Sequence, residues 1–225
     1  KDLDDIPEYW TAMMRKRLPK VQYTLREISC GVQFLGFADE RSIIHSELFA
    51  EYVNEHLKKY GLIIKDGIRQ TDNGSEYCGS WQAKNPSAYT LAIEAAKLIH
   101  GTIPPGAHRF QSDVETVHNL IEIDFYEIEN FTDRNDFMQK ANTYQLFFNL
   151  ERPNTYKENK SPWQLAQEKH PDIPIEALML PSVDLDALLN KKLATLATGG
   201  YDVYSAPLTC LEMCAIFFSM TLLAK

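Results

Sequence analysis

Hydrophobic and polar positions along the early part of the chain follow patterns that predict two paired strands and a helix. Residues 21–27 alternate between apolar and polar side chains, and residues 31–38 are rich in β-branched and aromatic ones, as strands usually are. The short polar link between these two segments favours an antiparallel pair. From 42 to 60 the apolar positions recur at helical spacing, and Gly61 is expected to stop this helix.

The remainder of the chain predicts one further strand and then mainly helices. The expected elements, in order, are a strand at 62–71, a small helix at 87–98, a short extended piece at 99–103, long helices at 112–130 and 133–150, and a short helix that opens at Ser161 and Pro162. This order predicts a mixed α/β fold in which helices flank a sheet. We expect a core domain over residues 1–167 and a peripheral C-terminal extension over residues 168–225.

The composition is that of a globular protein with an acidic balance. Hydrophobic residues make up 44% and charged residues 24% of the chain, which excludes a disordered or fibrous class. The net charge of −8 argues against a chain that only grips phosphates. An enzyme that collects carboxylates around metal ions can nevertheless be acidic and contact nucleic acid through local basic patches. The four cysteines lack zinc-finger spacing, so reduced thiols and a cytoplasmic location are expected.

Residues 207–224 form an almost continuously apolar segment, which Glu212 interrupts. A membrane span is one interpretation, but the segment is slightly short for a bilayer and carries a charge. We favour a docking helix, or a tail altered by truncation or a frameshift, and we expect no membrane partner.

Two acidic residues are the main candidates for chemistry. Asp72 follows a predicted strand, where a rigid sheet can hold a carboxylate toward a divalent cation; the alternative is an ordinary Asp-Asn-Gly turn without function. Glu115 opens a predicted long helix, whose positive end keeps a carboxylate ionised. Its alternative role is structural, because Ser112 and Glu115 have the spacing of a capping box. His118 fits either a solvated helix face or a polar contact near the substrate.

Taken together, two segments resemble the DDE-type transposases and integrases, a group that includes bacterial insertion-sequence transposases and retroviral integrases. Residues 71–77 read Thr-Asp-Asn-Gly-Ser-Glu-Tyr and match the segment that carries the family's second catalytic aspartate. Val114, Glu115 and His118 match the x-Val-Glu-x-x-His pattern that carries the family's catalytic glutamate. The separation between the two segments is longer than in compact retroviral integrases, but tolerable for bacterial relatives with an inserted helix.

Two later segments extend the resemblance. Residues 149–153 and 160–163 are similar to the Asn-x-x-Arg-Pro and Lys-Thr-Pro elements that close the family's core. The resemblance therefore covers residues 21–167 and implies a ribonuclease H-like mixed sheet flanked by helices. It departs at the front, where the family's first aspartate has no clear match. We expect that aspartate just upstream of Lys1, in an N-terminally truncated core, and treat Asp2 as the weaker candidate.

The resemblance implies a DNA transposase core that cuts strands and transfers a 3′-hydroxyl into target DNA. Asp72 and Glu115, with a first aspartate, would hold two Mg²⁺ or Mn²⁺ ions. The implied partners are DNA, as element ends and target, and further copies of the chain in a homo-oligomer on DNA in the bacterial nucleoid. An inactive transposase remnant and a ribonuclease H-like nuclease without strand transfer are the alternatives. Phosphate contacts are expected from Arg69, Lys84, His108 and Arg109.

Overall fold

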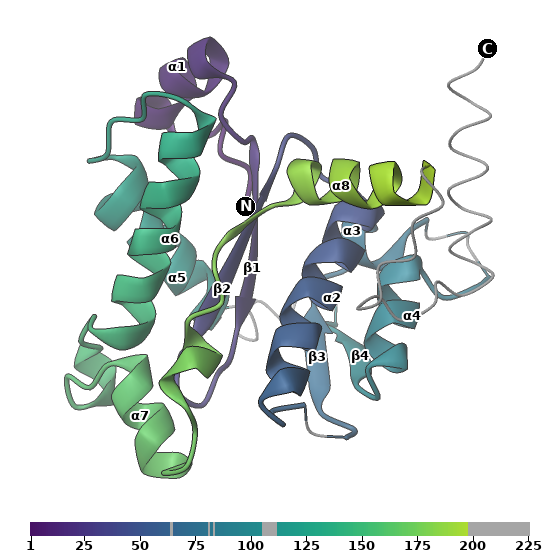
Figure 1. The fold of residues 1–225 in the computed structure, drawn as a ribbon, viewed down its shortest axis with the longest axis vertical. Coiled ribbons are helices and arrows are strands. Elements are labelled where there is room, and N and C mark those ends of the chain that lie inside the picture. Colours follow the sequence, from purple (N-terminus) through teal and green to yellow (C-terminus); the bar gives the residue numbers. More distant parts are fainter. Residues whose placement is uncertain (64, 81, 83, 105–111, 198–225) are drawn as a thin grey trace. The chain divides into compact units, whose positions relative to one another are not determined.

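The computed structural model describes residues 1–63, 65–80, 82, 84–104 and 112–197 (Figure 1). Residues 1–188 form one compact unit and residues 189–225 belong to a second, of which only the rest of helix α8 is described. The strands are β1 (Val21–Arg26), β2 (Gln33–Ala38), β3 (Ile68–Thr71), β4 (Ile99–Thr102) and β5 (Val183–Asp184). The α-helices are α1 (Pro7–Lys16), α2 (Ile43–Lys59), α3 (Ser75–Cys78), α4 (Ala88–Ala95), α5 (Ser112–Ile121), α6 (Arg134–Leu150), α7 (Pro162–Lys169) and α8 (Leu185–Ala197). Single turns of other helix types are η2 (Glu122–Tyr126), η3 (Thr155–Lys157) and η4 (Ile175–Leu178).

The strands form one mixed sheet and one parallel pair. β1 and β2 pair antiparallel, with Val21 opposite Ala38, and β5 joins the other edge of β2 in parallel. β3 and β4 pair in parallel, with Ile68 opposite Ile99. A single antiparallel bridge joins Asp2 to Val21, so the chain already runs beside β1 at its start. The predicted α/β class and the antiparallel pair are therefore confirmed.

Helix boundaries follow the capping chemistry in the sequence closely. Ser42 caps α2 by accepting a hydrogen bond from the His45 amide, and Gly61, at a positive φ of 68°, follows its end. Ser161 and Gln164 form a capping box at α7, with Pro162 in the first turn. These capping residues explain why both helices could be predicted from the sequence.

Several elements differ from the sequence-based expectation, and α3, β5 and α8 are among those not expected. Helix α1 was not expected, although Pro7 occupies its first turn as proline often does. The strand expected at 62–71 is confined to β3, because a turn region precedes it. The helix expected at 112–130 continues past α5 only as the π-helical turn η2, which ends at Tyr126.

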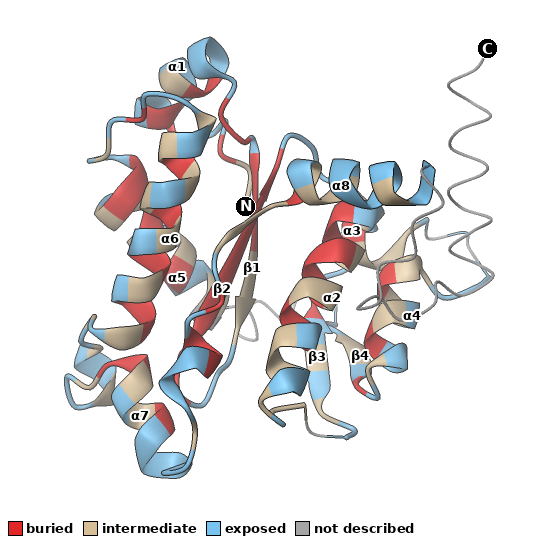
Figure 2. Ribbon diagram, in the orientation of Figure 1, coloured by how far each residue is buried: buried red, intermediate tan, exposed pale blue. Residues whose placement is uncertain are grey.

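The main core is unusually aromatic and lies between the β1–β2 sheet and helices α1, α5 and α6. Phe137 of α6 is fully buried, and its ring lies 4.9 Å from that of Phe37 on β2. Tyr9 of α1 contacts the ring of Tyr126 edge-on at 5.1 Å, while its hydroxyl donates to the Pro19 carbonyl. The buried colour along β1, β2 and the inner side of α6 follows this core in Figure 2.

Helix α6 also satisfies backbone groups of β2 that no strand reaches. The amide N–H of Leu35 donates to Gln145 Oε1 at 2.7 Å, and that of Gln33 donates to Asn149 Oδ1 at 2.9 Å. Asn149 Nδ2 donates in return to the Gln33 carbonyl at 2.8 Å. Both helix side chains are fully buried, so these hydrogen bonds remove polar groups from an apolar interior.

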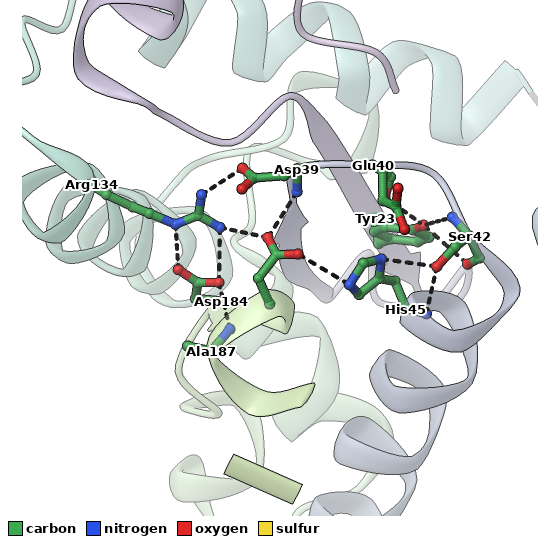
Figure 3. Close-up of polar contacts among 9 residues, drawn as sticks. Tyr23, Asp39, Glu40, Ser42, His45, Arg134, Asp184 and Ala187 are labelled. Atoms are coloured by element: carbon green, nitrogen blue, oxygen red, sulfur yellow. Dashed lines mark hydrogen bonds and ion pairs between the residues drawn. The ribbon is translucent and has the colours of Figure 1, made fainter. Parts of the chain in front are cut away.

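An ionic cluster holds β5 and the first turn of α8 against this core (Figure 3). Arg134, at the start of α6, binds Asp184 through two nitrogens at 2.5 and 2.9 Å. Its other contacts are Asp39 at 2.6 Å and Asp186 at 2.7 Å. Asp186 also lies 3.2 Å from Nε2 of the buried His45, at the start of α2. The cluster thereby links α6, the start of α2 and the β5–α8 segment, which are far apart in sequence.

Candidate functional site

Asp72 lies directly after β3, at the carboxyl end of the parallel pair with β4, and is exposed to solvent. Its Oδ1 accepts a hydrogen bond from the Gly74 amide at 2.9 Å, which fixes one carboxylate oxygen. On the neighbouring residue, Asn73 Nδ2 donates to the Ile103 carbonyl at 2.8 Å, just beyond β4. The Ile103 amide donates back to Thr71 at 3.0 Å. The turn and the strand-end carboxylate inferred from the sequence therefore coexist at Asp72.

Gly74 is required beside Asp72 because a second carboxylate occupies the adjoining space. A Cβ at Gly74 would collide with the carboxylate of Glu76 and lie 2.9 Å from Asp72 Oδ1. Glu76 is buried, and its Oε1 lies 3.5 Å from Nε of Arg41. A side chain at position 74 would consequently force these two acidic groups to move.

Arg41 is the positive charge that faces these carboxylates. It forms an ion pair with Asp2 as well as with Glu76. Burial alone would lower the pKa of Arg41, but the hydrogen bond that Arg41 donates to Asp2 and the negative charges of Glu76, Asp2 and Asp72 raise it. Asp2, Glu76 and Asp72 therefore share one electrostatic neighbourhood. Sequence analysis missed Arg41, whose only signal was a lone basic residue in the polar link after β2.

Glu115 lies in the first turn of α5 and is exposed. One turn later, His118 Nε2 lies 3.1 Å from Thr24 Oγ1 on β1, so α5 is attached to the sheet through this ring. Burial, followed by the positive charges of Lys1, lowers the pKa of His118 to about 3, and the ring is neutral at physiological pH. The Lys1 side chain also reaches Glu122 of η2 at 2.6 Å.

The first two residues contact groups that neighbour each candidate residue in turn. Lys1 contacts η2, which continues α5, and the next residue, Asp2, contacts Arg41 on the side of Glu76 and Asp72. Across the described part of the chain, no group of three or more His, Cys, Asp or Glu side chains is already arranged to hold a metal. The capping box predicted at Ser112 concerns a side chain outside the described residues.

The basic residues predicted to contact phosphate divide into separate cases. Arg69 is half-buried, and its guanidinium already donates to Asn54 Oδ1 at 2.7 Å. Lys84 is exposed and remains a candidate. His108 and Arg109 lie outside the described residues, as does the apolar segment at 207–224. Within the described ranges, no helix combines the length and apolar character needed to cross a bilayer.

No family model and no curated protein matches the sequence. Among solved structures, the chain is similar to one chain in the cryo-EM structure of the simian T-cell lymphotropic virus intasome in complex with PP2A regulatory subunit B56 gamma. The identity is 16% and the TM-score 0.48, over 68% of this chain and 50% of that chain. The chain therefore spans about half the length of the protein it matches. By its own geometry the chain is a mixed α/β protein with helices flanking its strands.

Proposed function

We propose that the chain is the catalytic core of an enzyme that cuts DNA and transfers the cut strand, with Asp72 and Glu115 as ligands of divalent metal ions. The observation that carries the proposal is the exposed Asp72 carboxylate at the carboxyl end of β3, on a turn that hydrogen bonds fix to β4. The anchoring of the Glu115 helix to β1 through His118 supports it. The motifs that contain these residues resemble those of DDE-type transposases and integrases.

The donor chemistry at these positions fits Mg²⁺ or Mn²⁺. Both ions prefer oxygen ligands, and both candidate carboxylates are open to solvent. Asp72 keeps Oδ2 available, since the Gly74 amide occupies Oδ1. When bound, such ions lower the pKa of an attacking water or hydroxyl and stabilise the oxygen that leaves phosphorus. Asp2, which shares Arg41 with Glu76, is the carboxylate that could complete a set of three.

The chain's own residues would prepare this site before DNA arrives. The positive charge of Arg41 offsets the repulsion among the carboxylates around it, so these carboxylates can lie close together before a metal ion binds. Neutral His118 holds the start of α5 on β1 and adds no positive charge beside Glu115. DNA phosphates would be contacted by exposed cations such as Lys84, and a homo-oligomer on DNA would bring two DNA ends together.

The test is a cleavage and joining assay with the full-length protein, supercoiled plasmid DNA and Mg²⁺. We expect Asp72→Asn and Glu115→Gln each to reduce metal-dependent activity by about 10²-fold or more, because each removes an anionic ligand of the metal ions that would stabilise the transition state. Asp66→Asn and Glu127→Gln are matched controls. Asp66 is an exposed acid at the other end of β3, and Glu127 is an exposed acid just after η2.

Two results would separate the possibilities. Metal-dependent nicking without joined products would favour a nuclease over a strand-transfer enzyme. Full activity in both Asp72→Asn and Glu115→Gln would refute the metal-ligand assignment, whatever the controls show.

A further inference from the structure

We propose that His100 is a positioning residue for Asp72, a role that rests on the proposed function of Asp72 as a metal ligand. His100 lies on β4, opposite Arg69 of β3, and its ring joins two hydroxyl groups from different elements. Nε2 lies 2.8 Å from Thr71 Oγ1, and Nδ1 lies 2.8 Å from Thr90 Oγ1 on α4. The ring therefore bridges α4 to the residue that precedes Asp72.

The hydroxyl of Thr71 sets the direction of these hydrogen bonds. Thr71 Oγ1 donates its single proton to the Asp72 carbonyl at 3.0 Å, so it can only accept from the ring of His100. Nε2 must then carry the proton. In a neutral ring Nδ1 is therefore an acceptor, and the Thr90 hydroxyl, which also lies 3.0 Å from Ser87 Oγ, can donate its one proton to it. A neutral ring with one donor and one acceptor meets this requirement, and burial lowers the pKa of His100, which keeps the ring neutral.

The packing around the ring leaves it little freedom to turn. The buried ring of Tyr89 lies edge-on to His100 at a centroid distance of 5.1 Å. Thr90 is itself held in the first turn of α4, where its amide donates to Ser87 Oγ at 3.1 Å. A continuous set of hydrogen bonds thus runs from the start of α4 through His100 and Thr71 to the main chain of Asp72.

This connection controls where the Asp72 carboxylate points. The carbonyl of Asp72 is fixed through Thr71, and Oδ1 is fixed through Gly74, which leaves Oδ2 as the oxygen free to bind a cation. Without the ring of His100, the Thr71 hydroxyl can rotate away and the main chain at Asp72 loses a donor. We then expect Asp72 to sample more orientations and to bind a metal less tightly.

Two substitutions of similar size distinguish positioning from general stability. In His100→Gln the side-chain amide lies near the former Nε2 position and can still donate to Thr71. In His100→Asn the amide lies near the former Nδ1 position and reaches only Thr90. We expect His100→Asn to need about 10–100-fold more Mg²⁺ for half-maximal DNA cleavage than the wild type, and His100→Gln to stay near the wild type. Equal Mg²⁺ requirements in the two variants would overturn the proposal.

A second measurement decides the role of His100 even if the protein cuts no DNA. The Gly74 amide donates to Asp72 Oδ1, so its hydrogen exchange reports how firmly the carboxylate is held. We expect faster exchange at Gly74 in His100→Asn than in His100→Gln, with no change at the Asp66 amide, which donates to Lys97 at the other end of β3. Equal exchange rates at Gly74 would overturn the positioning role. If the wild type cut no DNA but the exchange rates at Gly74 differed as expected, the proposed function would be refuted and the positioning role of His100 would stand.

Discussion

Replacing Arg134 by alanine removes the centre of the ionic cluster that holds β5 and the start of α8. The guanidinium makes four contacts of 2.5–2.9 Å with three carboxylates, two of them a bidentate pair with Asp184. Asp184 also accepts from the Ala187 amide at 3.1 Å, so it helps to start α8. The variant leaves three negative charges close together without the cation that they share. We therefore expect a loss of stability in the unit formed by residues 1–188.

The expected size of that loss follows from the exposure of the cluster. Hydrogen bonds to charged groups contribute about 1.5–3 kcal/mol each when buried, and exposed ion pairs contribute about 0–1 kcal/mol. The Arg134 side chain is 25% exposed, between these limits. We expect Arg134→Ala to lower the free energy of unfolding by about 2–4 kcal/mol, since the contacts are not additive. For a domain of this size that corresponds to a Tm lower by roughly 4–16 °C.

Urea unfolding at pH 7, followed by far-UV circular dichroism, measures the change. Lys160→Ala is the matched control, because Lys160 also contacts two carboxylates, at 2.8 and 2.9 Å, but both partners are largely exposed. Arg134→Lys should recover only part of the loss, since an ammonium group cannot form the bidentate pair with Asp184. If Arg134→Ala destabilised the protein no more than Lys160→Ala, the cluster would not anchor β5.

Two further predictions concern the core and its pH response. Phe137→Ala should cost about 3–5 kcal/mol in urea unfolding, because it empties a fully buried aromatic site; a cost below 1 kcal/mol would contradict that packing. Burial alone would lower the pKa of His45, but the Asp186 carboxylate outweighs burial and raises it. The stability difference between wild type and His45→Gln should therefore be largest below about pH 6.5 and shrink as pH rises through the raised pKa. Urea unfolding over a pH series checks this, and a difference that grew with pH would be the opposite result.

Local signals in the sequence predicted most of the elements correctly. Helix α2 has apolar positions at helical spacing between a serine cap and Gly61, and α7 has a complete capping box. Helix α1 carried a weaker signal, since Ile6 before it supplies no side-chain cap and its buried residues, Tyr9 and Met13, are only a few among polar neighbours. The pairing of β5 with β2 could not be read from a two-residue strand, because tertiary contacts with α6 place it.

The residues of the candidate site also differ in whether a local sequence signal reveals them. Asp72 and Glu115 were identifiable because short motifs surround them, whereas Arg41 and His100 act through partners distant in sequence. Arg41 contacts Asp2 and Glu76, and no local pattern connects these three residues. Arg69 illustrates the converse, because a cation in a polar segment predicts a surface role, and only the fold reveals its contact with Asn54.

The side-chain amides of α6 along β2 have a consequence for assembly. An uncovered strand edge is a template on which another chain can add a strand and start aggregation. Here Gln145 and Asn149 occupy backbone groups of β2 that an incoming strand would need. We therefore expect this stretch of β2 to take no part in β-pairing between copies of the chain, and replacing Asn149 by leucine to leave the Gln33 amide and carbonyl without that partner.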